Sequence, residues 1–537
     1  MKYLKSFLII SIALITFSSC KNLNIAPADR FTNLDFWTTS ENVNNALNNV
    51  YGGMYNSSLY FNNTAMSDNA YSSPDVIASG SYDASYQGFL NVWSFHYAGI
   101  NSCNLFLSNV DQNKTLPAAV IARMKGEVRF IRAWHYFNLM KWWGAVPLII
   151  KPITPGQAKV MPRTSQDSVF NFIINELQAA STVLPSKDQY TAADKGRITN
   201  GAAMALEARV LLYQGGNMQK VADICDTLMN DQSVCGHYSL AADYDALFSD
   251  ADVNKDNPET MLALQYVPGV RTWSEDFDFA PISAGSRTNG MAPTQELVNS
   301  YLMLNGKPIT DPTSGYDANN PYSNRDPRLT ATVVYDKYVW TNPDRTTQII
   351  YIKPGSDPNP AHLNEYDPTG EHTLTGYYWR KYFDPNHLAG FSSGLNLQMI
   401  RYAEVLLDYA EARNDLGEMD ENIWNNTIRL IRQRAGFTNA GALDYPGSNA
   451  DMVEIIRRER RDEFAMEGLR IDDIRRWKIA DSVLNGYAHG AMFGDPTIDN
   501  GYLRVQSREF NPSRNYLWPI PASEIALDPN LIQNPGY

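Results

Sequence analysis

Residues 127–149 read EVRFIRAWHYFNLMKWWGAVPLI, and this stretch decides the fold. Apolar side chains recur on almost every face of the helix that it predicts, so most of that helix should be buried against other helices. Gly144 is expected to end the helix, and Pro147 to prevent its resumption. The stretch therefore predicts a scaffold element with several helical neighbours, and not an active site.

Helical periodicity recurs on both sides of this stretch. Ser40 is the predicted N-cap of a helix before it, and Thr199 of a helix after it. Alanine-rich helices follow one another through tight turns such as Gly215-Gly216, a pattern typical of tetratricopeptide-type hairpins. The sequence predicts a mainly α fold in which such hairpins form a superhelical scaffold. The scaffold is expected to comprise residues 40–55, 89–235 and 400–480.

Two regions lack this periodicity and are rich in Asn, Ser, Asp, Gly and Pro, namely residues 56–88 and 241–395. Long loops in a compact protein usually form a functional surface. TATVVYD, residues 330–336, and TQIIYIK, residues 347–353, are candidates for short strands. We expect these regions to form an irregular, loop-rich lobe that binds the ligand. The Pro-rich C-terminal segment, residues 510–537, cannot form a long helix.

The composition indicates a folded protein with an aromatic surplus. Hydrophobic residues make up 44% of the 537 residues and charged ones 19%, as in globular proteins. The net charge of -13 argues against nucleic acid as a partner, because few cations would be free to neutralise phosphates. Aromatic residues reach 12%, including 31 Tyr and 11 Trp. Such a surplus can pack a core or line a site that stacks on flat ligands.

The N-terminus predicts an export signal. An apolar run at residues 7–17, too short to span a bilayer, is followed by Ser18, Ser19 and Cys20. Small residues directly before a Cys resemble the bacterial lipoprotein cleavage box. We therefore predict a signal peptide over residues 1–19 and a lipid anchor at Cys20, the alternative being an ordinary secretory signal. No later stretch has eighteen apolar residues in a row, so the mature chain should be anchored by lipid alone.

Cysteine and acidic residues give no metal signature. Cys225 and Cys235 are close enough in sequence for a disulfide in an oxidising compartment, or they are small buried thiols. Four residues alternate like the start of a calcium loop: Asp250, Asp252, Asn254 and Asp256. Lys255 stands where an EF-hand needs Gly, so a solvated acidic turn is the better interpretation. No cofactor is expected, and a structural Ca²⁺ has no motif to support it.

Signatures of catalysis are absent from the sequence. It contains no G-x-S-x-G, no H-E-x-x-H, no Walker A loop and no Rossmann fingerprint. A carboxylate pair for glycoside hydrolysis leaves no sequence signature, because folding and not spacing brings the two acids together. We expect a protein without catalytic activity, with a glycoside hydrolase as the alternative.

Four stretches, taken in order, resemble one family. They are DFWTTSENVNNALNNVYGGMY after Cys20, the stretch 127–149, RYAEVLLDYAEARN with ERRDEFAMEGLRIDDIRRW, and LWPIPASEIALDPNLIQNPGY at the C-terminus. With these features the chain resembles the SusD/RagB family, the surface lipoproteins of Bacteroidetes-type bacteria that bind glycans beside a TonB-dependent transporter. Together the stretches bracket nearly the whole mature chain.

The resemblance implies a fold, a place and a function. It implies four tetratricopeptide-like hairpins, and an irregular second lobe that binds an oligo- or polysaccharide. It further implies a location on the outer membrane, with the lipid anchor at Cys20, and delivery of the glycan to a SusC-like TonB-dependent transporter. A binder of peptides or of another nutrient on the same fold is the closest alternative.

Glycan binding requires exposed aromatic faces and planar hydrogen-bonding groups, because sugar C–H faces stack on rings while vicinal hydroxyls suit Asp, Asn and Arg. The first loop offers Asp68, Asn69, Tyr71, Asp75, Tyr82 and Tyr86, and the second offers Arg271, Trp273, Phe277, Phe279 and Arg287. All but Tyr71 and Asp75 are our predicted ligand-binding residues. Trp273 is the strongest single candidate for ligand binding, because its sequence neighbours are polar and show no helical periodicity. Alternatively, these aromatic side chains fill the core of their own lobe.

A run of arginines near the C-terminus suggests a phosphate site at first sight. It comprises Arg457, Arg458, Arg460 and Arg461. Acidic residues alternate with them at Glu454, Glu459, Asp462 and Glu463, so we predict an ion-paired helix face instead.

Overall fold

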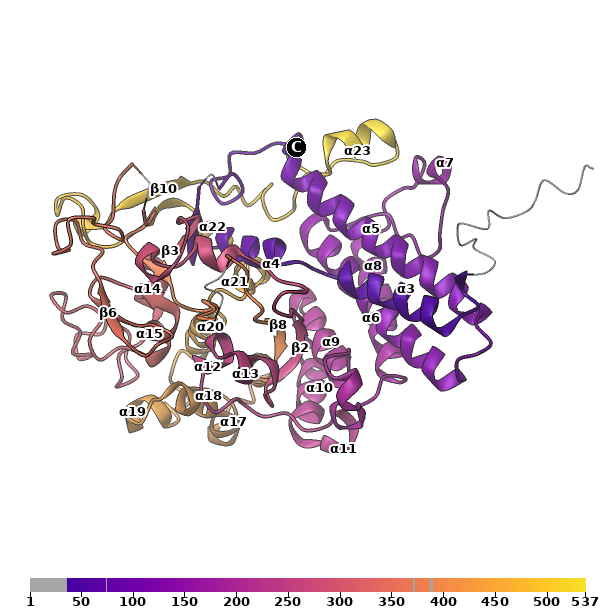
Figure 1. The fold of residues 1–537 in the computed structure, drawn as a ribbon, viewed down its shortest axis with the longest axis horizontal. Coiled ribbons are helices and arrows are strands. Elements are labelled where there is room, and N and C mark those ends of the chain that lie inside the picture. The colour runs from indigo at the N-terminus through magenta and orange to yellow at the C-terminus, as the bar shows by residue number, and fades with distance from the viewer. Residues whose placement is uncertain (1–35, 74, 370–371, 387–389) are drawn as a thin grey trace, which may run out of the picture.

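The computed structural model describes residues 36–537 except 74, 370–371 and 387–389. Figure 1 shows the helices of the first half of the chain on one side and the loop-rich middle on the other. This arrangement confirms the predicted mainly α class with a helical scaffold and an irregular lobe of short strands. The predicted signal peptide and the lipidated Cys20 lie outside the described residues.

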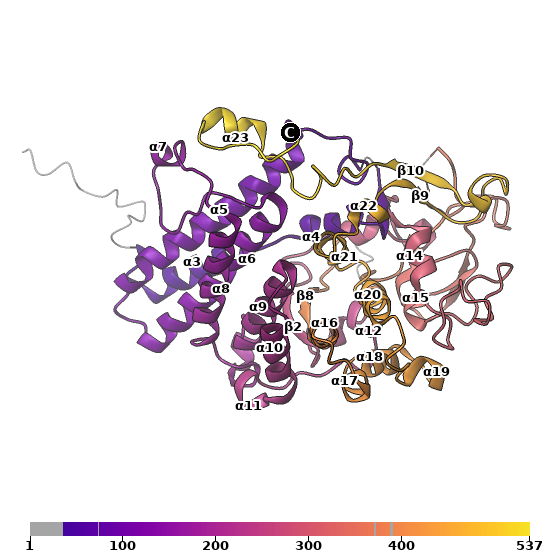
Figure 2. The same ribbon diagram turned by 180° about the vertical axis from the view of Figure 1, so that it is seen from behind.

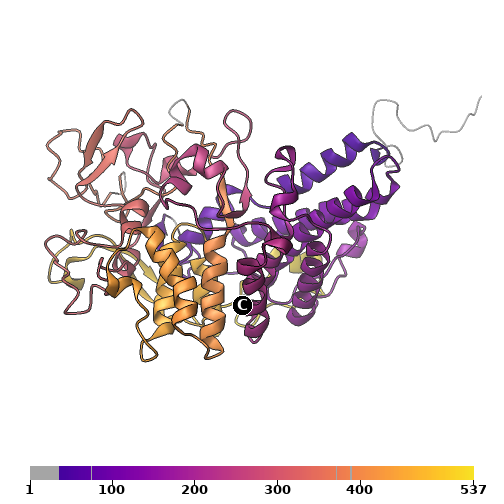
Figure 3. The same ribbon diagram turned by 90° about the horizontal axis from the view of Figure 1, so that it is seen from below.

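The scaffold is a succession of packed helices. Each of them contacts the next along the series α5, α6, α8, α9, α10, α16 and α20, as stacked helical hairpins require. Figure 3 shows the orange helices of the C-terminal part standing beside the purple helices of the first half. The scaffold helices are α3 (Ser40–Gly52), α5 (Gln87–Asn109), α6 (Ala118–Trp143), α8 (Gln166–Ser181), α9 (Asn200–Gln214), α10 (Met218–Asn230), α16 (Tyr402–Asp415), α17 (Glu421–Asn426), α18 (Ile428–Ala435), α20 (Met452–Glu463) and α21 (Arg470–Arg476).

Helix α6 holds the stretch that decides the fold. Every side chain from Glu127 to Trp143 except that of Arg129 is buried, since α5 and α8 pack against it. Gly144 ends the helix with a φ of 69°, and its N–H donates to the carbonyl of Met140 at 2.8 Å. The prediction of a buried scaffold helix that ends at this glycine is confirmed.

The start of α3 differs from the sequence prediction. Thr39, and not Ser40, caps this helix, because its hydroxyl accepts the N–H of Asn42 at 3.2 Å. Helices α17 and α18 are separated at Thr427, whose φ of -131° and ψ of -92° are not helical. Helix α20 ends at Glu463, before a turn in which Met466 has a φ of 65°.

The prediction of a continuous loop over residues 56–88 is wrong. Helix α4 (Ser57–Ala65) begins there because the Asn56 side chain accepts the N–H of Leu59 at 2.8 Å. Its Tyr60 and Phe61 are buried, and the short strand β1 (Ala70–Ser72) follows. Helix α4 was not predicted because its sequence is rich in polar residues, and it is tertiary packing that stabilises it.

The lobe is held together by antiparallel strand pairs and short helices. The strand pairs are β1 with β3 (Met291–Pro293), β2 (Thr260–Leu264) with β8 (Leu397–Arg401), β4 (Val333–Val334) with β7 (Tyr378–Trp379), β5 (Tyr338–Thr341) with β6 (Thr347–Ile350), and β9 (Gly486–His489) with β10 (Arg504–Arg508). The short helices of the lobe are α12 (Ala246–Ser249), α13 (Ala251–Lys255), α14 (Gln295–Ser300) and α15 (Pro327–Thr332). Short helices elsewhere in the chain are α7 (Pro155–Ala158), α11 (Gln232–Cys235), α19 (Ala440–Leu443), α22 (Ala480–Val483) and α23 (Ala522–Leu527).

The charged face of α20 is largely buried, where the sequence predicted an ordinary ion-paired helix surface. Glu459 and Glu463 have no exposed surface and bind arginines of other segments. Arg328 lies 3.0 Å from Glu459 and 3.3 Å from Glu463, and Arg401 lies 2.9 Å from Glu463. The ion pairing is confirmed, but it joins α20 to α15 and β8 within the core.

From β10 onward the chain runs from the lobe side to the scaffold side. Figures 1 and 2 show β10 on the lobe side, and α23 beside α5 on the scaffold side. Trp518 stacks on Trp142 with ring centroids 4.2 Å apart, and the Trp143 indole N–H donates to the carbonyl of Pro519 at 2.8 Å. As predicted, the segment contains only a short helix.

Cys225 and Cys235 are buried free thiols, so the disulfide alternative is excluded in this structure. Burial raises the pKa of the Cys235 thiol to about 11, so the thiol is protonated at neutral pH. Both side chains act as small apolar groups of the scaffold core.

Candidate functional site

The structure brings parts of the two loop-rich regions, residues 56–88 and 241–395, together. Strand β1 pairs with β3 so that Tyr71 faces Ala292, and the N–H of Thr294 donates to the carbonyl of Asn69 at 3.1 Å. The hydroxyls of Ser57 and Ser58 both donate to Glu275 at 2.8 Å. Segments more than 200 residues apart in the sequence therefore share one surface of the lobe.

Asp68 and Asn69 do not lie on that surface. Asp68 is buried between Arg461 and Arg470, with N–O distances of 3.0 and 2.8 Å. Burial opposes ionisation, but the two guanidinium groups outweigh it and hold the pKa of Asp68 well below its usual range. Asn69 accepts a hydrogen bond from Arg461 at 2.7 Å. The expectation that these two side chains face a ligand is corrected, because their polar atoms bind the scaffold.

Trp273 is a core residue. Its side chain is 4% exposed, its indole N–H donates to the carbonyl of Leu395 at 2.7 Å, and its ring lies 5.2 Å from that of Phe61. Phe277 and Phe279 are buried as well. The prediction that these rings are exposed is wrong. The physical reason is that their polar neighbours occupy turns at the surface while the rings point inward.

Tyr82 and Tyr86 are half-buried and contact the C-terminal segment or the start of α5. The Tyr82 hydroxyl accepts a hydrogen bond from the Asn515 amide at 2.6 Å, and its ring is stacked 6.3 Å from that of Tyr537. Tyr86 packs edge-on against Phe89. These tyrosines are thus separate from the second predicted loop.

Arg287 remains exposed and belongs to a group that we name the Phe391 platform, formed by Asp278, Arg287 and Phe391. Arg287 donates to Asp278 at 3.0 and 2.8 Å, and its guanidinium lies 5.3 Å from the centroid of the Phe391 ring. Phe391 is 45% exposed and packs edge-on against Phe277. The platform offers an open ring beside a fixed charged fork, the combination that stacks on and hydrogen-bonds a sugar.

Phe391 was missed by the sequence predictions. Its only signal is an isolated aromatic residue in the stretch AGFSSG, residues 389–394. The same kind of signal pointed to Trp273, so the pattern alone does not separate an exposed ring from a buried one.

Arg271 also remains exposed, and its guanidinium lies 5.1 Å from the centroid of the Tyr266 ring. It borders a cavity of about 230 Å³ between α3 and β2. Arg271 and Arg287 are thus the two predicted ligand-binding arginines that stay accessible.

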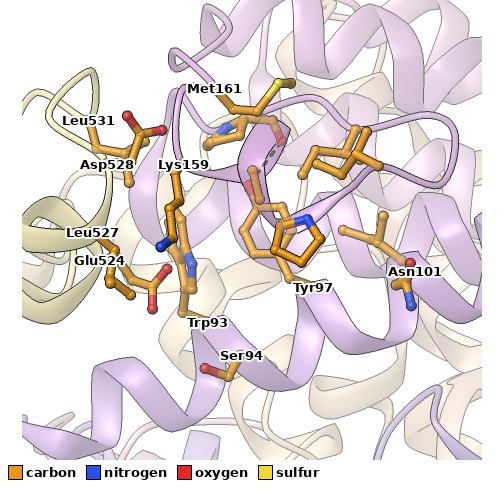
Figure 4. A pocket seen from close by; sticks show the side chains of 16 residues that line it. Trp93, Ser94, Tyr97, Asn101, Lys159, Met161, Glu524, Leu527, Asp528 and Leu531 are labelled. Carbon is orange, nitrogen blue, oxygen red and sulfur yellow. Dashed lines mark hydrogen bonds between the residues drawn. The ribbon is translucent and has the colours of Figure 1, made fainter.

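A second, apolar cavity of about 390 Å³ lies in the scaffold. Figure 4 shows Glu524, Leu527, Asp528 and Leu531 on one side of it, and Tyr97 and Asn101 on the other, with Trp93 and Lys159 between them. Leu527 of the lining is exposed, and Ile150, Val160 and Ile532, each next to a lining residue in the sequence, are exposed as well. Exposed apolar side chains that form one contiguous patch are typical of an interaction with another protein.

The described residues contain no group of three or more metal-ligating side chains. Asp250 instead caps α13 by accepting the N–H groups of Asp252 and Val253. In the same part of the chain, no helix is long and apolar enough to cross a bilayer.

Comparison with known proteins identifies the family. Residues 258–537 match the SusD family, and residues 26–212 match a family described as starch-binding and associating with the outer membrane. The chain belongs to the SusD family.

Solved and curated SusD-like proteins agree over almost the full length. A SusD-like carbohydrate binding protein from Bacteroides fragilis is 29% identical with a TM-score of 0.83, over 93% of this chain and 100% of that one. A SusD-like protein of Formosa agariphila is 24% identical over 100% of both chains. A laminarin binding SusD-like protein, 24% identical, shares the fold with a TM-score of 0.65, over 93% of this chain and 100% of its own.

Proposed function

We propose that this SusD-family protein binds an oligo- or polysaccharide at the outer membrane and delivers it, uncleaved, to a SusC-like TonB-dependent transporter. The observation that carries the proposal is the similarity over almost the whole chain to a SusD-like protein described as carbohydrate-binding. The laminarin-binding relative supports the same class of ligand. Lipid at Cys20 would hold the mature protein at the membrane.

The Phe391 platform is the proposed sugar contact. The apolar face of a pyranose would stack on Phe391, and Arg287 with Asp278 would hydrogen-bond adjacent hydroxyls. Because Arg287 is held by Asp278 and lies over the ring, little side-chain freedom is lost on binding. The arrangement suits capture and contains no second carboxyl group opposite Asp278 among the platform residues.

The glycan proposal is tested by electrophoresis in native gels cast with different polysaccharides, with a reducing-sugar assay on the same samples. We expect retardation without sugar release. Phe391→Ala should weaken binding roughly tenfold, which corresponds to about 1.4 kcal/mol. Val339→Ala, at an exposed lobe position, is the matched control and should bind as the wild type does. Sugar release that survives purification would establish the hydrolase alternative instead.

The transporter is the proposed partner of the scaffold face around the apolar cavity of Figure 4. This face has exposed apolar side chains at Ile150, Val160 and Leu527, whose burial in an interface would be favourable. Ile150→Glu combined with Leu527→Glu should abolish co-purification with the transporter while gel retardation by polysaccharide persists. Undiminished co-purification of this variant would place the interface elsewhere.

A further inference from the structure

Two cavities between the scaffold and the lobe lie next to each other. One of about 390 Å³ extends toward Lys187 and Lys255, and the other, of about 230 Å³, toward Arg271. They have six lining residues in common, namely Lys195, Gly196, Arg197, Leu262, Ala263 and Gln265. We name their union the Gly196 trough.

Gly196 makes room for the Gln265 side chain, which lies between the two cavities. Its φ of 89° is in the left-handed region, and a Cβ at this position would lie 1.5 Å from the Gln265 amide nitrogen. The Gln265 side chain therefore crosses directly over the glycine and partitions the trough. Because Gln265 is exposed, a bound chain can displace its amide or hydrogen-bond to it.

The trough is cationic in a chain whose net charge is -13. Its basic lining residues are Lys187, Lys195, Arg197, Lys255 and Arg271. The acidic ones are Asp188 and Asp256, both in the larger cavity, and among the described residues no carboxylate lines the smaller one. A local excess of positive charge in a cleft raises the local concentration of anions.

Three of these cations have neutral partners in the described structure. Arg271 lies over the Tyr266 ring. Lys187 donates to the carbonyls of Asn257 and Pro258 at 3.3 and 3.2 Å, and Lys255 donates to the Asn396 side-chain oxygen at 2.6 Å. Burial lowers the pKa of Lys255 to about 8, and the opposing effect of the Asp384 carboxylate is the smaller one.

The other two cations are paired, to different degrees. Arg197 is held by Glu127 at 3.1 Å and by Asp194 at 2.7 Å, so it fixes the wall of the trough. Lys195 pairs with Asp256, and both side chains are exposed. An exposed pair of this kind contributes little stability, so Lys195 can exchange its partner for a ligand anion.

We propose that the Gly196 trough binds an anionic oligosaccharide, carboxylated or sulfated, and that this protein therefore selects acidic glycans. The inference rests on the proposed glycan-binding function and names the class of glycan. The Arg271 fork binds one acidic group in bidentate fashion. The exposed Gln265 side chain hydrogen-bonds sugar hydroxyls, while the buried Leu262 and Ala263 of β2 form the floor of the trough.

Calorimetry on the full mature chain tests this inference. The three ligands are oligogalacturonate, a sulfated galactan oligosaccharide and a neutral laminarin oligosaccharide, each at low and high salt. We expect at least one acidic ligand to bind more tightly than the neutral one, with an affinity that falls as salt rises. The two acidic ligands distinguish carboxylate from sulfate as the recognised group.

Arg271→Gln should weaken the binding of the acidic ligand roughly tenfold, because the charge-assisted hydrogen bonds of the guanidinium are lost. Arg271→Glu should weaken it further, because a negative charge then faces the acidic group. Arg504→Gln is the matched control, since Arg504 is also exposed and also lies over a tyrosine ring, that of Tyr487. Circular dichroism checks that each variant is folded. Both Arg271 substitutions alter an exposed side chain, so they should not impair folding.

The outcomes separate this inference from the function on which it rests. If neutral glycans bind and acidic ones have no advantage, the trough inference is overturned while the glycan-binding proposal stands. Acidic binding that is unchanged by both Arg271 variants also overturns it. If no glycan of either class binds, the proposed function itself fails.

Discussion

At the scale of single residues, Asp75 is the clearest source of pH dependence. One carboxyl oxygen accepts the N–H of Ala78 at 2.9 Å, and the other is buried without a partner among the described atoms. Burial raises the pKa of Asp75 from 3.8 to about 6. Because this pKa is raised in the folded state, the cost of ionisation is fully present above pH 6 and disappears as the pH falls toward 4.

Asp75→Asn should therefore stabilise the protein at pH 8 by up to about 3 kcal/mol, and much less at pH 4.5. Urea unfolding at the two pH values measures the difference. Asp83→Asn is the control, because Asp83 is fully exposed and its pKa is lowered by hydrogen bonds from Ser85. Equal stabilisation of Asp75→Asn at both pH values would show that the carboxyl is not buried as described.

The predicted binding residues show that the sequence alone does not predict whether a single aromatic side chain is buried or exposed. Trp273 and Phe391 are both isolated rings in Gly- and Ser-containing stretches, yet one is buried and the other exposed. The difference arises from contacts distant in sequence, since Trp273 pairs with Ser393 and donates to Leu395. The exposure of Arg271 and Arg287 was easier to predict, because a guanidinium in a loop is rarely buried without a carboxylate beside it.

At the scale of elements, α20 joins the scaffold to the lobe through buried charge. Burial opposes ionisation of Glu463, but Arg434, Arg401 and Arg328 outweigh it and hold its pKa well below the usual range. These guanidiniums also pair with Glu459, Glu467 and Glu259. Glu463→Gln would therefore leave the buried network one carboxylate short, which should cost about 3–5 kcal/mol at pH 7. The contribution of Glu463 is lost as the pH falls below about 4.5, its ordinary value.

A matched control lies on the same helix. Glu454 forms an exposed pair with Arg458 at 2.7 Å, so Glu454→Gln should cost less than about 0.5 kcal/mol. Urea midpoints of the two variants at pH 7 give the comparison. A similar loss of stability in both variants would mean that the ion pairs of Glu463 are accessible to water.

The helices themselves were largely predictable, because their signals are local. Thr199 caps α9 as predicted, and α6 ends at Gly144. Helix α4 and the burial of α20 were not predictable. The partners of Glu459 and Glu463 are arginines up to about 130 residues away, whereas within α20 alternating charges look like an ordinary solvated face.

At the scale of the whole molecule, the C-terminal segment packs against helices of the first half of the chain. The two family matches divide the sequence into an N-terminal and a C-terminal part, but the structure interlocks them. Trp518 stacks on Trp142, and Asp68 pairs with Arg470. Neither part can bury its core without the other, so we expect a single cooperative unfolding transition.

Trp518→Ala tests this coupling. Removal of a buried indole from between Trp142 and Phe89 should cost about 3–5 kcal/mol. Since scaffold and lobe unfold together, the variant should shift the whole urea transition, with far-UV circular dichroism and tryptophan fluorescence still coincident. Leu527→Ala, an exposed position of the same segment, should change stability by less than about 0.5 kcal/mol. Two separate transitions would instead mean that the lobe keeps its fold without the C-terminal contact. Its strand pairs and the ion pairs of α20 would then be sufficient to hold the lobe folded.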